Sequence, residues 1–270
     1  MNCYIEETPI YYQEYGSGIP VLCLHGYSID HQVMTGCLEP LFQTLDGYKR
    51  IYLDLPGMGK SPANENIKNA DDMLEVIKKF IDKVIGKENF LLIGESYGCY
   101  LSLGLVLHLE QRIDGLFLIC PVVVVDREKR ILPRKELLEC EDGFIKANEM
   151  DSNYTDFMAC AVVATEETFA RYKCEIPPAM ALSDPSFVKR YQREGYGFSF
   201  DSKIEDIAFE KPTCVLLGRQ DNVVGYMDAL KLVNNFSRAT FVIADGAGHS
   251  LQTERENLFE INLIDWLERI

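Results

Sequence analysis

Short apolar runs recur along the 270-residue chain, separated by longer stretches with helical spacing. Runs rich in Val, Ile and Leu are typical of strands that are buried on both faces of a sheet. They span Pro20–Leu24, Lys49–Asp54, Phe90–Gly94, Gly115–Cys120, Thr213–Gly218 and Thr240–Ala244. This strand–helix rhythm predicts an α/β protein with a mostly parallel, doubly wound sheet covered by helices on both sides.

The intervening segments predict the covering helices. Residues Asp71–Ile85 place their apolar side chains on one helical face, and Tyr97–Leu109 and Gly225–Asn235 are further candidates. The chain closes with a helix over Glu254–Ile270, whose inward-facing residues are predicted to be Leu258, Ile261, Leu263, Ile264 and Leu267. Near the start, Ile10–Tyr15 predicts an antiparallel strand at one edge of the sheet.

The strand–helix rhythm stops between residues 126 and 203. Charged helical patches alternate there with residues that interrupt regular structure, namely Pro177, Pro178, Pro185, Gly195 and Gly197. We therefore expect a helical cap insertion over residues 126–203, within a core formed by residues 1–125 and 204–270. An insertion at the carboxyl ends of parallel strands would cover the edge where such sheets bind ligands.

Composition excludes several kinds of partner. The chain has 27 basic and 42 acidic residues, a formal charge of −15 and a pI near 4.7, so it would repel nucleic acid and anionic membranes. We expect a small-molecule ligand. The nine cysteines include no C-x-x-C pair, which argues against a zinc site or a disulfide framework. Reduced cysteines, no visible signal peptide in Met1–Ile10 and no spanning segment favour the cytoplasm.

The segment FLLIGESYGCYLSLGL contains the main chemical signal. An apolar strand ends at Gly94-Glu95-Ser96-Tyr97-Gly98, and an apolar helix begins at once. In this context G-x-S-x-G predicts a sharp, strained turn that exposes a serine nucleophile, with Gly94 and Gly98 removing side chains that would collide. The alternative is a turn of small residues that only joins the strand to the helix.

Backbone amides near this turn could bind an oxyanion. The Tyr97 N–H lies at a helix start, where amides face developing negative charge. A second amide is expected from Tyr27, in the loop after the first apolar strand. His25 and Gly26 precede it, and we interpret them as support for this loop, with His25 serving as a hydrogen-bonding group.

A serine nucleophile needs a base, and the chain has four histidines. His249 is best placed, on a Gly-rich loop between the last apolar strand and the final helix, whereas His108 lies inside the helix after Ser96 and His31 is interpreted as a loop or pocket residue. The orienting carboxylate is predicted to be Asp221, just after Thr213–Gly218. Asp126 is the main alternative, and Asp245 is interpreted as bracing its own loop.

These motifs resemble the α/β-hydrolase superfamily, in particular its cofactor-free serine hydrolases with a helical cap. The resemblance covers nearly the whole chain and includes LCLHGYSID, IYLDLPGMGKS, GRQDNVV and GAGHS. It implies a Ser96–Asp221–His249 triad, in the chain order expected for this fold, and requires no metal or organic cofactor. A serine nucleophile also disfavours dehalogenase and epoxide hydrolase chemistry, which uses a carboxylate in this family.

The leading hypothesis is hydrolysis of a small ester or thioester through an acyl-enzyme on Ser96. The resemblance also allows a carbon–carbon bond hydrolase, whose acidic substrates would need a basic group near the serine, with candidates Arg127, Arg130, Arg134, Arg190 and Arg193. A proline iminopeptidase-like activity is disfavoured, since Tyr97 stands where those enzymes commonly have Trp, although Glu166 and Glu167 could bind an ammonium group. A receptor with little turnover is a further alternative.

The cap is rich in aromatic residues, which could line an apolar pocket but more often pack a cap onto its base. They are Phe144, Tyr154, Phe157, Phe169, Tyr172, Phe187, Tyr191, Tyr196, Phe198 and Phe200. The sequence therefore leaves the substrate open, and without an assembly signal it leaves the oligomeric state open too.

Overall fold

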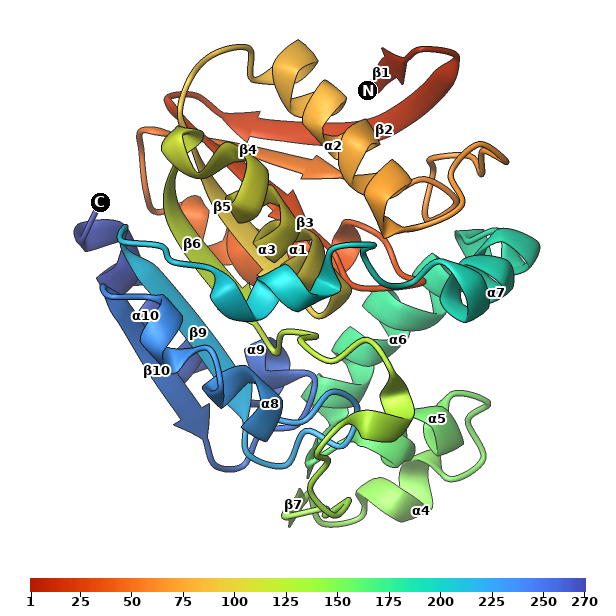
Figure 1. Ribbon diagram of the computed structural model, residues 1–270. Coiled ribbons are helices and arrows are strands. Elements are labelled where there is room, and N and C mark those ends of the chain that lie inside the picture. Colours follow the sequence, from red (N-terminus) through yellow and green to blue (C-terminus); the bar gives the residue numbers. More distant parts are fainter.

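A central eight-stranded sheet runs through the computed structural model, which describes residues 1–270 (Figure 1). The strand order is β1-β2-β4-β3-β5-β6-β9-β10. All neighbours pair in parallel except β1 with β2 and β2 with β4. The strands are β1 (Asn2–Ile5), β2 (Thr8–Gly16), β3 (Ile19–Leu24), β4 (Tyr48–Leu53), β5 (Phe90–Glu95), β6 (Ile113–Ile119), β9 (Thr213–Gly218) and β10 (Ala239–Ala244). The predicted fold class is confirmed.

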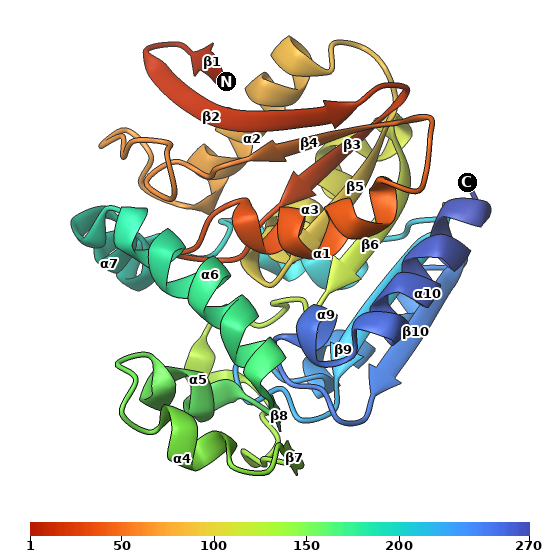
Figure 2. The same ribbon diagram turned by 180° about the vertical axis from the view of Figure 1, so that it is seen from behind.

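Helices cover both faces of this sheet. Figure 1 shows α2 (Ala70–Val84) and α3 (Tyr97–Leu109) on one face, and Figure 2 shows α1 (Gln32–Phe42) and α10 (Glu256–Glu268) on the other. Shorter elements are η1 (Glu110–Arg112), η2 (Arg127–Lys129), η3 (Asp201–Asp206), α8 (Met227–Leu230), η4 (Val233–Asn235) and α9 (Leu251–Glu254). No helix has the length and apolar character needed to cross a bilayer.

The segment between β6 and β9 forms a separate layer beside the carboxyl ends of the strands (Figure 2). It contains β7 (Glu139–Cys140), α4 (Phe144–Asn148), α5 (Tyr154–Cys160), β8 (Val163–Ala164), α6 (Glu166–Leu182) and α7 (Pro185–Glu194). Part of it has a small apolar core of its own, made by Phe144, Phe157, Ala161, Ala164 and Phe169. We therefore propose residues 126–203 as a cap on a core of residues 1–125 and 204–270.

Three local predictions from the sequence are wrong. The predicted edge strand Ile10–Tyr15 lies within β2, but β1 pairs with its outer side and takes the edge. The single helix predicted over Gly225–Asn235 is instead the separate turns α8 and η4. Pro177 and Pro178 do not interrupt the cap; they lie inside α6, whose start is stabilised by a Thr165–Thr168 capping box.

The C-terminal helix is also shorter than predicted, and one of its five predicted inward-facing residues, Ile261, is exposed. A break at Arg255 separates α9 from α10. Trp266 is fully buried against Phe117 of β6, and its indole N–H donates to the Pro212 carbonyl at 3.0 Å. Leu263 is fully buried as predicted, whereas Ile261 is 66% exposed. The Trp266 anchor therefore sets which face of α10 meets the sheet.

We expect Leu263→Ala to lower the free energy of unfolding by about 2–5 kcal/mol, because it removes a fully buried side chain. The matched change Ile261→Ala, on the exposed face of the same helix, should alter it by less than about 0.5 kcal/mol. Urea unfolding followed by the fluorescence of Trp266, the one tryptophan in the chain, measures both. Equal losses would contradict this orientation of α10.

Candidate active site

Ser96 lies at the turn between β5 and α3, with backbone angles φ 52° and ψ −113°. A positive φ is costly for a residue with a side chain, so the surrounding packing must hold it. Gly98 permits that packing, because a Cβ there would lie 2.1 Å from the Leu24 carbonyl oxygen of β3. A Cβ on Gly94 would likewise lie 2.8 Å from the Cys99 nitrogen. The turn requires both glycines.

The structure brings Ser96, His249 and Asp221 into one chain of hydrogen bonds. His249 Nε2 lies 3.0 Å from Ser96 Oγ, and His249 Nδ1 lies 2.9 Å from Asp221 Oδ2. With Nδ1 donating to the carboxylate, the Nε2 lone pair faces the serine hydroxyl. This is the tautomer that a general base acting on a serine needs.

Asp221 is held in place by the backbone that follows it. Its second oxygen, Oδ1, accepts hydrogen bonds from the Val223 and Val224 amides at 2.8 and 2.9 Å. The two alternative carboxylates are engaged elsewhere. Asp126 caps η2 and pairs with Lys129, and Asp245 accepts from the Gln220 side chain.

The other histidines have different surroundings. His25 is fully buried; its Nε2 accepts from the Leu55 amide at 2.9 Å, and its Nδ1 donates to the Gly26 carbonyl at 2.7 Å. His31 pairs with Asp54 at 2.7 Å, and His108 packs against Phe200. His25 thus joins the loop after β3 to the loop after β4.

The loop that contains Gly26 and Tyr27 packs against the serine. A Cβ on Gly26 would lie 3.1 Å from Ser96 Cβ. The Tyr27 hydroxyl donates to the Val188 carbonyl of α7 at 2.5 Å, and the hydroxyl groups of Tyr97 and Tyr191 lie 2.8 Å apart. Each of the two residues whose backbone amides we propose as oxyanion donors is therefore anchored to the cap by its side chain.

Burial and charge act in opposite directions on these groups. Burial alone would lower the pKa of His249, but the Asp221 carboxylate, with a smaller contribution from Glu95, raises it to about 9. Burial would raise the pKa of Asp221, yet the imidazolium charge and the Val223 and Val224 amides lower it overall. The pair therefore favours a charged imidazolium, the species formed when His249 accepts a proton.

Comparisons with known proteins identify the family of the chain. The family profile described as alpha/beta hydrolase fold matches residues 19–256. The chain belongs to the alpha/beta hydrolase family. An alpha/beta superfamily hydrolase from Oenococcus oeni PSU-1 is 33% identical, with a TM-score of 0.90 and 96% of each chain covered.

Two more distant relatives carry names of specific activities. A 2-hydroxy-6-oxononadienedioate/2-hydroxy-6-oxononatrienedioate hydrolase from Pseudomonas putida is 21% identical, over 97% of this chain and 92% of the relative. The structure of a meta-cleavage product hydrolase from Pseudomonas fluorescens IP01 is 21% identical, with a TM-score of 0.71, covering 99% of this chain and 97% of the other. The latter likeness shows the shared fold.

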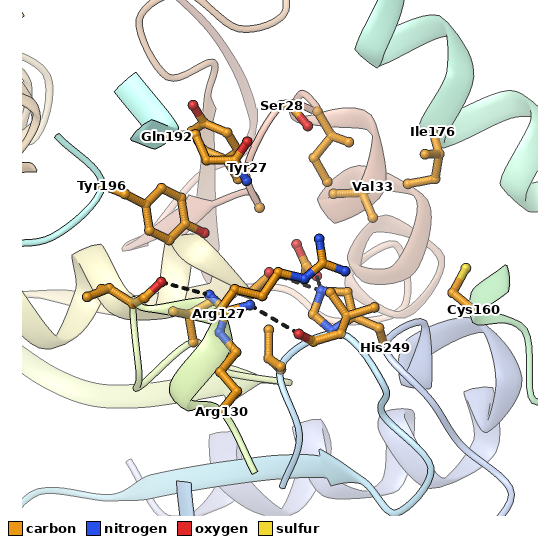
Figure 3. A pocket seen from close by; sticks show the side chains of 18 of the residues that line it. Tyr27, Ser28, Val33, Arg127, Arg130, Cys160, Ile176, Gln192, Tyr196 and His249 are labelled. Carbon is orange, nitrogen blue, oxygen red and sulfur yellow. Dashed lines mark hydrogen bonds and ion pairs between the residues drawn. The ribbon is translucent and has the colours of Figure 1, made fainter. Parts of the chain in front are cut away.

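This alpha/beta hydrolase has a cavity of about 730 Å³ that opens onto Ser96 and His249. Its walls come from α1, the cap and the loop that contains Gly26 and Tyr27, which we propose as the oxyanion loop, and its apolar part includes Val33, Ile176 and Met180. Arg127 and Arg130 enter from the start of the cap, and Figure 3 shows both on the His249 side of the cavity. Of the five arginines proposed from the sequence, Arg193 also lines the cavity, whereas Arg134 and Arg190 do not.

Potential ligand atoms for a metal lie close together at Cys120, Asp221 and His249, all within 4.8 Å of one another. These atoms are already engaged. Asp221 and His249 bond each other, and the Cys120 thiol donates to the Gly248 carbonyl at 3.6 Å. The group therefore serves the hydrogen-bond network of the His249 loop, and we assign no metal to it.

Glu254, which the sequence analysis missed, connects the His249 loop to the cap. Its Oε2 accepts from the Gly248 amide at 2.6 Å, and its Oε1 accepts from the Val162 and Val163 amides at 2.6 and 3.2 Å. Burial raises the pKa of Glu254, although these three amides oppose the shift. The sequence indicates Glu254 only by its place five positions after His249. Its partners in the cap, Val162 and Val163, are distant in the chain, so this contact could not be predicted.

We expect Glu254→Gln to lower the free energy of unfolding by about 1–3 kcal/mol, because one amide nitrogen replaces an acceptor and leaves a buried N–H unpaired. Turnover should fall as well, since the residue before His249 loses its anchor. Glu256→Gln is the control, because Glu256 is half exposed and only pairs with Arg171 at 3.3 Å. Unfolding and rate measurements on both variants test this. Indistinguishable variants would contradict the anchoring role.

Proposed function

We propose that this alpha/beta hydrolase is a serine hydrolase that cleaves a small ester or thioester through an acyl-enzyme on Ser96. The observation that carries the proposal is the continuous chain from Ser96 Oγ to His249 at 3.0 Å and from His249 to Asp221 at 2.9 Å. A strained turn presents the serine in the wall of a cavity, which supports a nucleophile better than a structural turn.

The proposed reaction begins when His249 Nε2 accepts the Ser96 proton and Ser96 Oγ attacks the substrate carbonyl. Asp221 stabilises the imidazolium that forms and keeps Nδ1 as the donor. The Tyr27 and Tyr97 amides are the proposed donors to the tetrahedral oxyanion. His249 then returns its proton to the leaving group, and the bond to that group breaks. Water, deprotonated by His249, releases the acyl group and restores Ser96.

The size and apolar lining of the cavity are suited to a substrate with an apolar acyl chain of modest size. Val33, Ile176 and Met180 line it, together with two cap tyrosines, Tyr172 and Tyr196. Most of the cap aromatics have a packing role, as the sequence suggested: Phe144, Phe157 and Phe169 form the small cap core, and Phe187 and Tyr191 are buried against the main core.

A carbon–carbon bond hydrolase is a second candidate, and the arginines favour it. Arg130 donates to the Val124 and Val223 carbonyls, and the ion pairs of this region are Lys129–Asp126 and Arg193–Glu194. Arg127 and Arg130 therefore line the cavity without a carboxylate partner, in a chain of formal charge −15. The Pseudomonas putida relative is named as a hydrolase of a dicarboxylate, 2-hydroxy-6-oxononadienedioate.

The iminopeptidase-like alternative receives less support. It needs acidic cap residues to bind a substrate ammonium group, but neither Glu166 nor Glu167 lines the cavity. Glu166 instead accepts a hydrogen bond from the Asn148 side chain within the cap at 2.7 Å.

The test of the first candidate is release of p-nitrophenol from a series of p-nitrophenyl acyl esters by the native protein and by Ser96→Ala. We expect turnover with a chain-length optimum, and a loss of about 10³-fold or more in Ser96→Ala, because the nucleophile is removed. Native protein that releases no p-nitrophenol across the series would contradict esterase activity and favour a narrow carbon–carbon substrate or a receptor.

The same assay separates the two candidates when each ester is paired with one that ends in a carboxylate. If the arginines bind an acidic substrate, Arg127→Gln should raise KM for the carboxylate ester by about tenfold while leaving the neutral ester unchanged. Arg134→Gln, which removes an exposed arginine away from the cavity, is the matched control. Equal effects on both esters would argue against an acidic substrate.

A further inference from the structure

Glu95 is a buried carboxylate that the proposed mechanism does not use. It is the last residue of β5, directly before Ser96, and its side chain is 5% exposed at the cavity wall. One oxygen, Oε1, lies 3.6 Å from His249 Nε2, and the other, Oε2, has no hydrogen-bond partner. Leaving such an atom unpaired is costly, so its persistence beside the active site needs an explanation.

The oxyanion loop leaves room for this carboxylate only because residue 26 is glycine. A Cβ on Gly26 would lie 2.2 Å from Glu95 Oε2. The Glu95 side chain is thus confined between the oxyanion loop on one side and the His249 ring on the other. Its distance from Nε2 is set by this packing together with the nearby Gly26 amide, which favours the charged carboxylate and opposes the rise of its pKa.

His249 therefore faces a carboxylate at each of its ring nitrogens. Asp221 accepts from Nδ1 at 2.9 Å, whereas Nε2 has two neighbours, Ser96 Oγ at 3.0 Å and Glu95 Oε1 at 3.6 Å. When the ring is an imidazolium, its Nε2 proton is attracted to both. A carboxylate binds that proton more strongly than a hydroxyl does, so Glu95 competes with the nucleophile for the base.

We propose that Glu95 is a positioning residue that sets the protonation state of His249: its carboxylate holds the imidazolium form and limits the pH range in which His249 can act as the base for Ser96. This inference rests on the proposed serine hydrolase function. The same negative charge stabilises the imidazolium formed during acylation, so Glu95 lowers the population of free base but supports the transition state.

Most of the other titratable groups around Glu95 and His249 are neutral, so only a few charges affect the protonation of this pair. Cys37 of α1, Cys99 of α3 and Cys120 after β6 have thiol pKa values raised by burial, as does the Tyr196 hydroxyl, so all four are neutral near pH 7. Besides Glu95, the charges that shift the pKa of His249 are Asp221, which raises it, and Arg130, which lowers it. Arg127, Arg193, Asp126 and Glu194 also line the cavity. Burial raises the pKa of Glu95 to about 7, against the opposing effect of the His249 charge.

The test is the pH dependence of kcat/KM for a p-nitrophenyl ester in the native protein and in Glu95→Gln. Removing a negative charge lowers the pKa of His249, so the acid limb should move to lower pH by about one unit. The high-pH plateau should fall by up to about tenfold, since the imidazolium of the transition state loses the same stabilisation. Glu75→Gln, an exposed glutamate on α2 that pairs only with Lys78, controls for net charge.

An acid limb in Glu95→Gln that coincides with that of the native protein would overturn the proposal, even if activity fell. A purely structural role predicts that outcome, with lower stability and an unmoved pH profile. If the native protein shows no Ser96-dependent hydrolysis at any pH, the proposed function itself is refuted. The two failures are therefore distinguishable.

Titration of His249 in the native protein tests the proposal even if the Glu95→Gln variant does not fold. The His249 ring proton signals, assigned by comparison with His249→Gln, should move in two steps as pH rises, the first reporting Glu95 and the second the imidazolium. In Glu95→Asp, which keeps the charge on a shorter side chain, the acid limb should fall between those of the native protein and Glu95→Gln. A single-step titration would contradict a coupled pair.

Discussion

The close contact between the Ser96 turn and β3 is the constraint on which the rest of the site depends. Because residue 98 has no side chain, the start of α3 lies against the Leu24 carbonyl, and Ser96 is held at a positive φ. The loop after β3 is thereby brought onto the serine. Parallel pairing of β5, β6, β9 and β10 then delivers the Asp221 and His249 loops to the same edge of the sheet. The strand order and the close packing of the turn thus bring Ser96, Asp221 and His249 together.

Electrostatics adds a second constraint, because the site buries two carboxylates around one imidazole. Asp221 satisfies its oxygens with His249 and two amides, whereas Glu95 leaves one oxygen unpaired. Arg130 places a positive charge near His249, but its N–H groups donate to backbone carbonyls and not to either carboxylate. This arrangement favours an imidazolium, at the cost of needing a higher pH to free the base. The cap contributes through Glu254, which binds the His249 loop and the cap with one carboxylate.

Much of this could be predicted from the sequence because the informative residues follow strands. The bounds of β9 and α3 match the predictions for Thr213–Gly218 and Tyr97–Leu109, since those segments are uniformly apolar and are flanked by clear turn residues. Ser96, Asp221 and His249 each follow a parallel strand, so their meeting was expected. Helix α1 was missed, as Gly36 and Pro40 interrupt its helical signal. The roles of Glu95 and Glu254 depend on contacts between distant segments that no local pattern encodes. Arg127 was one of five candidate arginines, and only the folded structure shows which of the five line the cavity.

The central claim is that the His249–Asp221 pair activates Ser96 as a nucleophile, and covalent labelling tests it most directly. The native protein would be incubated with a fluorophosphonate, digested, and its peptides weighed by mass spectrometry. We expect one phosphonyl group, on the peptide that contains Ser96, with labelling abolished by unfolding and greatly slowed in His249→Gln. Labelling that is absent, lies on another residue, or proceeds equally fast in His249→Gln would contradict it.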